Sequence, residues 1–321
     1  MVPDDPIPDR IHAKPVPRPG RIVGALCVLV LVAMLTNALV TNPNFRWERV
    51  GEYLFASPVL TGVRYTLILT FGSMAIAAVM AVALAVMRRS DNFVMRWVSW
   101  AYIWFFRGTP VFVQLVFWGL LPLLYQNLSL GVPFGPELFT FRTTDLISPF
   151  RAALLGLAFN EAAYLAEIVR TGLNSVDTGQ EEAAKALGMR PSLILRRIIL
   201  PQAMRVIVPP TGNETISMLK TTSLVTATGF ALDLFFAQNQ LGNRYFQPLP
   251  FLVLAAIWYL VVTTVLMVGQ HFLERHFGKG FNKNQGQGRK RLGGKPARPT
   301  RAQAIAASGT VHEDPFLGSD A

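Results

Sequence analysis

Long apolar segments constrain this chain more than any other feature. Hydrophobic residues make up 51% of its 321 residues and charged residues only 15%, and the apolar residues are gathered in blocks. A helix needs about 20 apolar residues to cross roughly 30 Å of hydrocarbon, whereas helices of water-soluble proteins alternate polar and apolar faces. The sequence therefore predicts an all-α membrane protein with about six transmembrane helices.

The predicted spans follow one another with short polar connections. The first, 22–40, has a basic flank and is interpreted either as a membrane anchor or as the hydrophobic region of a signal peptide. We favour a retained anchor, because the block is long for a signal sequence and has no clear small-x-small cleavage site. The other spans are predicted at 62–87, 106–125, 150–171, 206–230 and 249–273.

The two ends of the chain differ in composition from the apolar blocks. Residues 1–21 are rich in proline and charge, and residues 276–321 are rich in glycine, glutamine and basic residues. Segments of this kind cannot bury enough apolar surface to fold on their own. We therefore predict a disordered tail at each end, with the helix at 22–40 and a core at 55–275 between them.

The formal net charge of +11 could indicate a nucleic-acid-binding protein, because basic residues neutralise phosphates. Many of the basic residues, however, lie in the C-terminal tail and in short loops between the apolar blocks. That distribution follows the positive-inside rule of membrane proteins. It predicts a multi-pass protein with both termini in the cytoplasm, and it argues against a nucleic-acid partner.

The sequence also argues against a metal site, a cofactor and an enzymatic activity of the chain by itself. The single cysteine, Cys27, excludes an intramolecular disulfide, and the four histidines are scattered without metal-ligand spacing. A nucleotide would need a glycine-rich phosphate loop that ends in lysine and a hydroxyl residue. The nearest match, at 293–296, lacks both the first glycine and the hydroxyl.

A polar segment between the fourth and fifth predicted spans carries a dense set of helix signals. Thr178 and Glu181 fit a capping box, and Gly188 can take the left-handed conformation that ends a helix. A second short helix is predicted from Pro191 to near Pro201. The segment is then two helices joined by a glycine turn on the cytoplasmic side, and the alternative is an amphipathic connector lying on the lipid surface.

This segment resembles the EAA signature of bacterial ABC-importer permeases. The signature reads glutamate-alanine-alanine, three residues, glycine, nine residues and I-x-L-P, and it is found here between Glu182 and Pro201. The resemblance implies that the segment enters a cleft on a separate ATP-binding subunit and couples its closure to the membrane helices. The residues assigned to this coupling are Glu181, Glu182, Ala183, Ala184, Leu187, Gly188, Ile198, Leu200 and Pro201.

Three further segments are similar to the polar amino-acid branch of that family, which includes histidine, glutamine and glutamate importers. They are FRGTP at 106–110, an AYxAEIVR-like helix at 163–170 and an LLKxTSL-like segment at 219–224, where Thr221 stands in place of a frequent aspartate. The resemblance implies a five-helix core with 22–40 as an extra N-terminal helix. Its structural signature residues are Arg107, Gly108, Thr109 and Pro110.

Polar residues within the spans are candidates for the translocation path, because ionisable groups in hydrocarbon usually face a cavity or a partner. The ionisable ones are Glu161, Glu167, Glu214 and Lys220. Helical spacing arranges the polar side chains as one stripe on each of two spans, and the carboxylate of a zwitterionic amino acid could meet Lys220 there. Alternatively, Glu167 and Lys220 pair with each other or with neighbouring arginines to lock the helices together. The candidate path residues are Asn160, Tyr164, Glu167, Asn213, Glu214, Ser217, Lys220 and Thr222.

The combined expectation is the membrane subunit of an ABC importer for polar amino acids in a bacterial plasma membrane. The resemblance implies as partners ATP-binding subunits that hold the ATP, a second identical or related permease, and an extracellular or periplasmic binding protein. A permease for a peptide, a phosphate or a metal is the main alternative. A secondary transporter would show paired broken helices in inverted halves, and a membrane scaffold would use the polar segment only to recruit a cytosolic partner.

Overall fold

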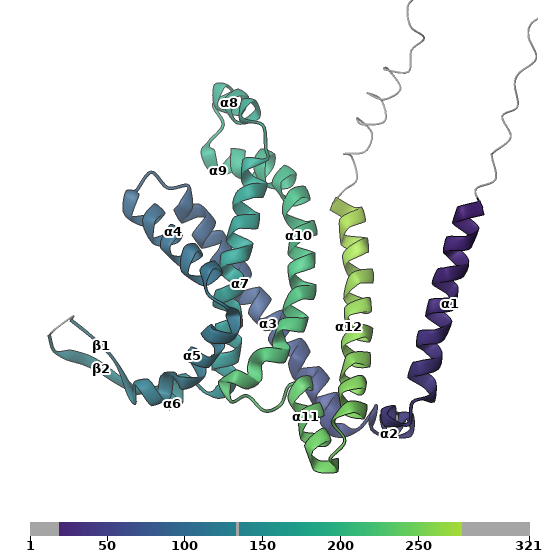
Figure 1. Ribbon diagram of the computed structural model, residues 1–321. Coiled ribbons are helices and arrows are strands. Elements are labelled where there is room, and N and C mark those ends of the chain that lie inside the picture. Colours follow the sequence, from purple (N-terminus) through teal and green to yellow (C-terminus); the bar gives the residue numbers. More distant parts are fainter. Residues whose placement is uncertain (1–18, 133–134, 278–321) are drawn as a thin grey trace, which may run out of the picture.

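The computed structural model describes residues 19–132 and 135–277, and this part of the chain is almost entirely helical (Figure 1). Of the two predicted disordered tails, only residues 19–21 and 276–277 are described. Both stretches are helical, at the start of α1 (Pro19–Thr41) and at the end of α12 (Pro248–Phe277). The remainder of each predicted tail lies outside the described residues.

Four helices of the described part are long and apolar enough to cross a membrane: α1, α3 (Ser57–Arg88), α7 (Pro149–Asn174) and α12. A fifth span is possible if α4 (Phe93–Gly108) and α5 (Val111–Leu124), which are bent by 104°, count as one. Helix α10 (Leu200–Thr221) was predicted as a span but is not among the helices that are apolar enough. It nevertheless packs inside the bundle, against α7 and α12.

The third predicted span, 106–125, is interrupted in the structure. Pro110 restricts the residue before it to an extended backbone, and Thr109 accordingly has φ −114° and ψ 143°. Helix α4 therefore ends at Gly108, and α5 starts at Val111 in a new direction. The FRGTP segment thus marks a sharp break between two helices.

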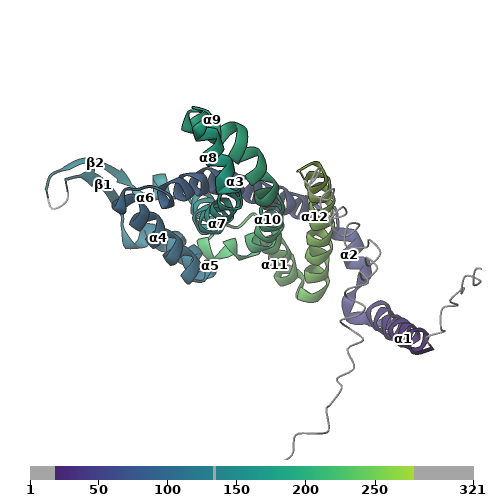
Figure 2. The same ribbon diagram turned by 90° about the horizontal axis from the view of Figure 1, so that it is seen from above.

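Helix α7 is the centre of the bundle. It packs against α3, α4, α5 and α10, and Figure 2 shows these helices around it. Alanine and glycine on its buried face let the neighbouring helices approach closely. At Gly156, for example, an added Cβ would lie 2.9 Å from the side chains of Leu115 and Trp118.

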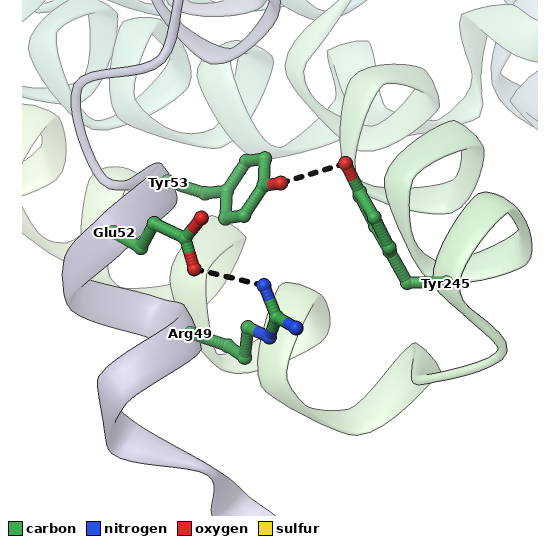
Figure 3. Close-up of polar contacts among 4 residues, drawn as sticks. All are labelled: Arg49, Glu52, Tyr53 and Tyr245. Atoms are coloured by element: carbon green, nitrogen blue, oxygen red, sulfur yellow. Dashed lines mark hydrogen bonds and ion pairs between the residues drawn. The ribbon is translucent and has the colours of Figure 1, made fainter.

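Helix α1 stands apart from the bundle and all its described side chains are exposed (Figures 1 and 2). The chain reaches the bundle through η1 (Pro43–Phe45) and α2 (Trp47–Tyr53). Figure 3 shows how α2 is fixed to α11 (Leu234–Tyr245): the Tyr53 hydroxyl donates to the Tyr245 hydroxyl at 2.6 Å, beside the Arg49–Glu52 ion pair of 2.9 Å. The block predicted at 22–40 is helical, as part of α1, and α2 connects it to the core.

A two-stranded antiparallel hairpin, which the all-α prediction did not include, separates α5 from α6 (Thr143–Leu146). Its strands are β1 (Asn127–Gly131) and β2 (Glu137–Arg142). Leu128 lies opposite Phe141, and Leu130 lies opposite Phe139. Because side chains alternate between the two faces of a strand, these four apolar residues share one face.

Candidate functional site

The polar segment of the EAA signature projects from one end of the bundle as α8 (Thr178–Ala186) and α9 (Pro191–Ile194) (Figure 1). The residue that caps α8 is Asp177, whose carboxylate accepts a hydrogen bond from the Gly179 amide at 2.7 Å. The predicted capping box of Thr178 and Glu181 is therefore wrong. Glu181 instead forms an ion pair of 2.9 Å with Lys185, and the hydrogen bond from Lys185 lowers the pKa of the Glu181 carboxyl.

The turn between the two helices is as predicted, because Gly188 has φ +73° in the left-handed region. The second helix, however, does not end near Pro201. It continues through a π-helical turn, η2 (Leu195–Ile199), directly into α10. Pro201, which has no amide hydrogen to donate, is the second residue of α10 and lies directly after this π-helical turn. The segment is thus joined to a bundle helix without an intervening loop.

The residues of the signature divide into a buried and an exposed set. Ala184, Ile194 and Ile199 form a small buried apolar cluster that also contacts Leu173 and Val176, at and just after the end of α7. Leu187 is 82% exposed and Leu200 is 41% exposed. Glu182, Ala183 and Gly188 are exposed as well, which leaves one face of α8 and its glycine turn open to a partner.

A cavity of about 470 Å³ lies at the break between α4 and α5 and is bounded by α7 and α10. Most of its lining residues carry polar or charged groups, and four of them belong to the FRGTP segment. The lining residues are Arg107, Gly108, Thr109, Pro110, Val111, Leu157, Asn160, Glu161, Tyr164, Glu214, Ser217, Met218 and Thr221.

A network of side-chain amides holds the break in place. The Asn160 amide donates to the Phe106 carbonyl at 3.0 Å and to the Gln114 side-chain oxygen at 3.1 Å. The Gln114 amide donates to the same Phe106 carbonyl at 3.0 Å and to the Thr109 carbonyl at 3.1 Å. Carbonyls at the end of a helix have no partner within that helix, so these bonds satisfy the end of α4. Gln114, only 5% exposed, was not among the predicted site residues, although it is the lone amide in the apolar helix that follows FRGTP.

Charged residues are distributed along the cavity and its two neighbours. Glu161 is 5% exposed, and its Oε1 has no hydrogen-bond partner in the described part of the chain. The Arg107 guanidinium lies 5.3 Å from the centroid of the Tyr164 ring. Two adjoining cavities, of about 580 and 440 Å³, share Arg107, Tyr164 and Glu167 in their walls. Glu167 forms a 2.7 Å ion pair with Arg170, one of the neighbouring arginines expected as its partner, and not with Lys220. Because both residues lie on α7, the pair does not lock two helices together.

The predicted path residues are only partly brought together. Asn160, Tyr164, Glu214 and Ser217 line the 470 Å³ cavity, and Glu167 lines the two adjoining ones. The other three line none of these cavities. The Asn213 side-chain oxygen accepts from Gln270 of α12 at 2.9 Å, the buried Thr222 hydroxyl donates to the Leu219 carbonyl at 2.7 Å, and Lys220 is exposed.

Residues 73–279 match the family described as binding-protein-dependent transport system inner membrane component. The chain belongs to this family. This inner membrane component is 50% identical over 280 residues to an arginine transport system permease protein, ArgU, of Corynebacterium glutamicum, with 86% of each chain covered. It is 35% identical over 213 residues to the histidine/lysine/arginine/ornithine transport system permease protein HisM of Salmonella typhimurium, with 64% of this chain and 84% of HisM covered.

A solved structure supports the same assignment. A crystal structure of an amino acid ABC transporter with histidines is similar to this inner membrane component with a TM-score of 0.58 and 32% identity, and the match covers 69% of this chain and 95% of that one. The family resemblance expected from the EAA signature and the FRGTP segment is thus confirmed, as is the helical membrane fold. Residues 19–132 and 135–277 contain no group of three or more histidine, cysteine or acidic side chains placed to hold a metal ion.

Proposed function

We propose that this chain is the translocation subunit of an ATP-driven importer for polar amino acids, and that cationic amino acids such as arginine are its substrates. The carrying observation is the polar cavity between α4, α5, α7 and α10, with the buried Glu161 carboxylate in its wall. The names of two relatives, one for arginine and one for histidine, lysine, arginine and ornithine, support the same class of substrate.

The chemistry of the cavity fits a small cationic zwitterion. Its volume of about 470 Å³ is within the usual range for small-molecule sites. A carboxyl group inside a membrane protein is costly and is usually retained for a functional reason. Glu161 and Glu214 both line the cavity, so a substrate with two cationic groups finds two carboxyl groups there.

We also propose that ATP is bound by a partner subunit and that α8 and α9 dock onto it. The exposed face of α8 with Glu182 is available for such a contact, as is the turn of Leu187 and Gly188 that follows the helix. The docked helices continue through η2 into α10, whose Glu214 and Ser217 line the cavity. A movement of the ATP-binding subunits therefore has a direct connection to the substrate path, and it alternately opens that path to each side of the membrane.

The proposed orientation puts this docking end in the cytoplasm. Support comes from the excess of Lys and Arg on this side and from Figure 1, in which α8, the first residues of α1 and the last residues of α12 lie at the same end of the bundle. Both termini are then cytoplasmic. A second identical or related permease and an extracellular or periplasmic binding protein complete the proposed complex, which lies in a bacterial plasma membrane.

Uptake into vesicles tests the proposal. The chain is reconstituted with the ATP-binding subunit and the binding protein encoded beside it, and uptake of radiolabelled L-arginine is measured with and without ATP inside. We expect saturable uptake that requires ATP and is inhibited by unlabelled lysine, ornithine or histidine. Uptake driven by an ion gradient without ATP would instead identify a secondary transporter, and inhibition by peptides or phosphate alone would overturn the substrate class.

Glu161→Gln sharpens the test at the level of a single residue. The substitution keeps the size of the side chain and replaces its carboxyl group with an amide that cannot ionise. Arginine uptake is expected to fall at least about tenfold, which corresponds to the loss of one hydrogen bond to a charged group. Glu137→Gln, on the exposed hairpin strand β2, is the matched control and should leave uptake unchanged. Equal uptake by the Glu161 variant and the wild type would remove this residue from the substrate path.

A further inference from the structure

Arg107 occupies a place in the bundle that its role as part of a sequence signature does not explain. It is the last basic residue of α4 and immediately precedes the break. Its side chain lines the 470 Å³ cavity and both adjoining cavities, so it stands where the three meet. Among residues 19–132 and 135–277, it is also the only basic residue in the wall of this 470 Å³ central cavity.

The Arg107 guanidinium forms no ion pair with a side chain of the described residues. It rests over the Tyr164 ring at 5.3 Å from the centroid, a cation–π arrangement that leaves its donors free at the edge of the group. No carboxylate of the described residues lies within 4.0 Å of it. The ion pairs found anywhere in the described part of the chain are Arg49–Glu52, Arg170–Glu167 and Lys185–Glu181. The residue is exposed, and it lines all three cavities.

The backbone that carries Arg107 is held rigidly. The carbonyl of the preceding residue, Phe106, accepts one hydrogen bond from Asn160 and another from Gln114, both at 3.0 Å. The backbone position from which the side chain extends is therefore set in advance, and the contact with the Tyr164 ring orients the guanidinium. Preorganised donors of this kind bind an anionic group with little loss of conformational entropy.

An amino acid brings one anionic group into this cavity, its α-carboxylate. A planar guanidinium can donate two parallel hydrogen bonds to a carboxylate, an arrangement that a lysine ammonium cannot reproduce. Lys220, which the sequence suggested for this role, is exposed and lines none of the three cavities. Among the described residues, Arg107 is the one cation that lines the central cavity together with Glu161 and Glu214.

We propose that the Arg107 guanidinium binds the α-carboxylate of the transported amino acid, while Glu161 and Glu214 face its cationic groups. The inference rests on the proposed function of the cavity and deepens it. Arg107 then determines specificity, because it distinguishes an amino acid from an amine that has the same side chain. The stack on Tyr164 keeps the guanidinium at the cavity wall between one substrate molecule and the next.

A comparison of L-arginine with agmatine tests the inference, because agmatine is arginine without the carboxylate. Equilibrium binding of both compounds is measured on the full-length chain in lipid nanodiscs, co-purified with its ATP-binding subunit and without the binding protein. The wild type is expected to bind arginine roughly 10- to 100-fold more tightly than agmatine, as the loss of a hydrogen bond to a charged group implies. Arg107→Gln should abolish that preference by weakening arginine binding alone.

Two further variants separate binding from folding. Arg107→Lys restores the charge without the two parallel donors, so we expect a partial recovery of the preference for arginine. Arg88→Gln is the control, because Arg88 lines the adjoining 580 Å³ cavity but not the central one. The Arg88→Gln variant should prefer arginine over agmatine as strongly as the wild type does. Unchanged agmatine binding by Arg107→Gln shows at the same time that the variant is folded.

Each contrary result has its own meaning. If Arg107→Gln keeps the preference for arginine, or weakens arginine and agmatine equally, the residue has a structural role and the inference fails while the proposed function stands. If the wild type binds neither compound above background, the assignment of cationic amino acids to this cavity fails, and the inference falls with it.

Discussion

The loop of α8 and α9 and the cavity at the α4–α5 break are built in opposite ways. The residues assigned to the loop lie within 181–201, and several of them are exposed to a partner. The cavity takes its walls from residues 107–221 on four helices, and its shape depends on buried amides. The loop is therefore encoded locally and presents an exposed surface, whereas the cavity exists only once the helices have packed.

The largest effect is expected from loop variants that change this surface. Glu182→Lys reverses an exposed charge, and Gly188→Asp places a charged side chain at the turn where φ is +73°. Both should abolish arginine uptake while the protein stays in the membrane at the level of the wild type. Asp91→Lys, a charge reversal in the connection between α3 and α4, is the control and should retain uptake.

Uptake and membrane content, measured on the same vesicles, decide whether the loop acts through its surface. Full transport by either loop variant would break the comparison, because the loop would then be a passive connector. Loss of the protein from the membrane would instead mean that the loop contributes to folding, as the cavity does.

The second largest effect is expected at the network of Asn160 and Gln114 amides, which both stabilises the helix packing and shapes the cavity. Gln114→Leu is close in size but leaves the Thr109 carbonyl without its donor and removes one of two donors to the Phe106 carbonyl. A buried polar group left unsatisfied costs roughly 2–3 kcal/mol at the upper end of its range. Thermal unfolding in detergent should show a clear fall of the midpoint, with Gln126→Leu, an exposed residue before β1, as the control. An unchanged midpoint would contradict a structural role of the network.

Two glycines offer a direct comparison between the regions. A Cβ at Gly119 in α5 would lie 2.7 Å from the Thr228 Cα in η3 (Thr222–Thr228), so Gly119→Ala forces two backbones apart. At Gly188 a Cβ would meet nothing within 4 Å, and only the positive φ is unfavourable. We expect Gly119→Ala to lower the free energy of unfolding by about 2 kcal/mol and Gly188→Ala to lower it by about 1 kcal/mol. Equal or reversed losses in denaturant unfolding would show that the loop is packed as tightly as the cavity.

The same contrast explains which parts of the fold could be predicted. Apolar blocks identified the helices at 22–40, 62–87, 150–171 and 249–273, because burial in lipid is a property of the local sequence. The block at 106–125 was predicted as one span but contains the break between α4 and α5, since hydropathy does not register the turn imposed by Pro110. The hairpin escaped prediction because an exposed two-stranded ribbon has few signals of its own.

For the site, the sequence predicted the local structure of the α8 segment, but it did not predict which side chains from different helices meet at the cavity. The helix and glycine signals predicted α8 and its turn, but the capping residue and the end of the second helix were wrong. Helical spacing grouped Asn213 and Lys220 with Ser217, yet only Ser217 lines the cavity. Spacing fixes the angle between side chains on one helix and not the direction of the cavity, which depends on how α10 is rotated against α7. Gln114 was missed for the same reason, because its partners belong to other elements.

The smallest effect is expected at the Glu181–Lys185 pair on α8. The two side chains are 34% and 58% exposed and one helical turn apart, so the pair contributes about 0.3 kcal/mol. Lys185 lowers the pKa of Glu181, so this stabilisation is present above the ordinary glutamate pKa and is lost as the pH falls through the lowered value. Lys185→Gln should therefore lower the unfolding midpoint slightly at pH 7 and not at all in acid below the lowered pKa of Glu181. A difference that persists in acid would assign the effect to lost packing of the lysine chain, and an uptake loss above about twofold at pH 7 would give the pair a direct part in docking.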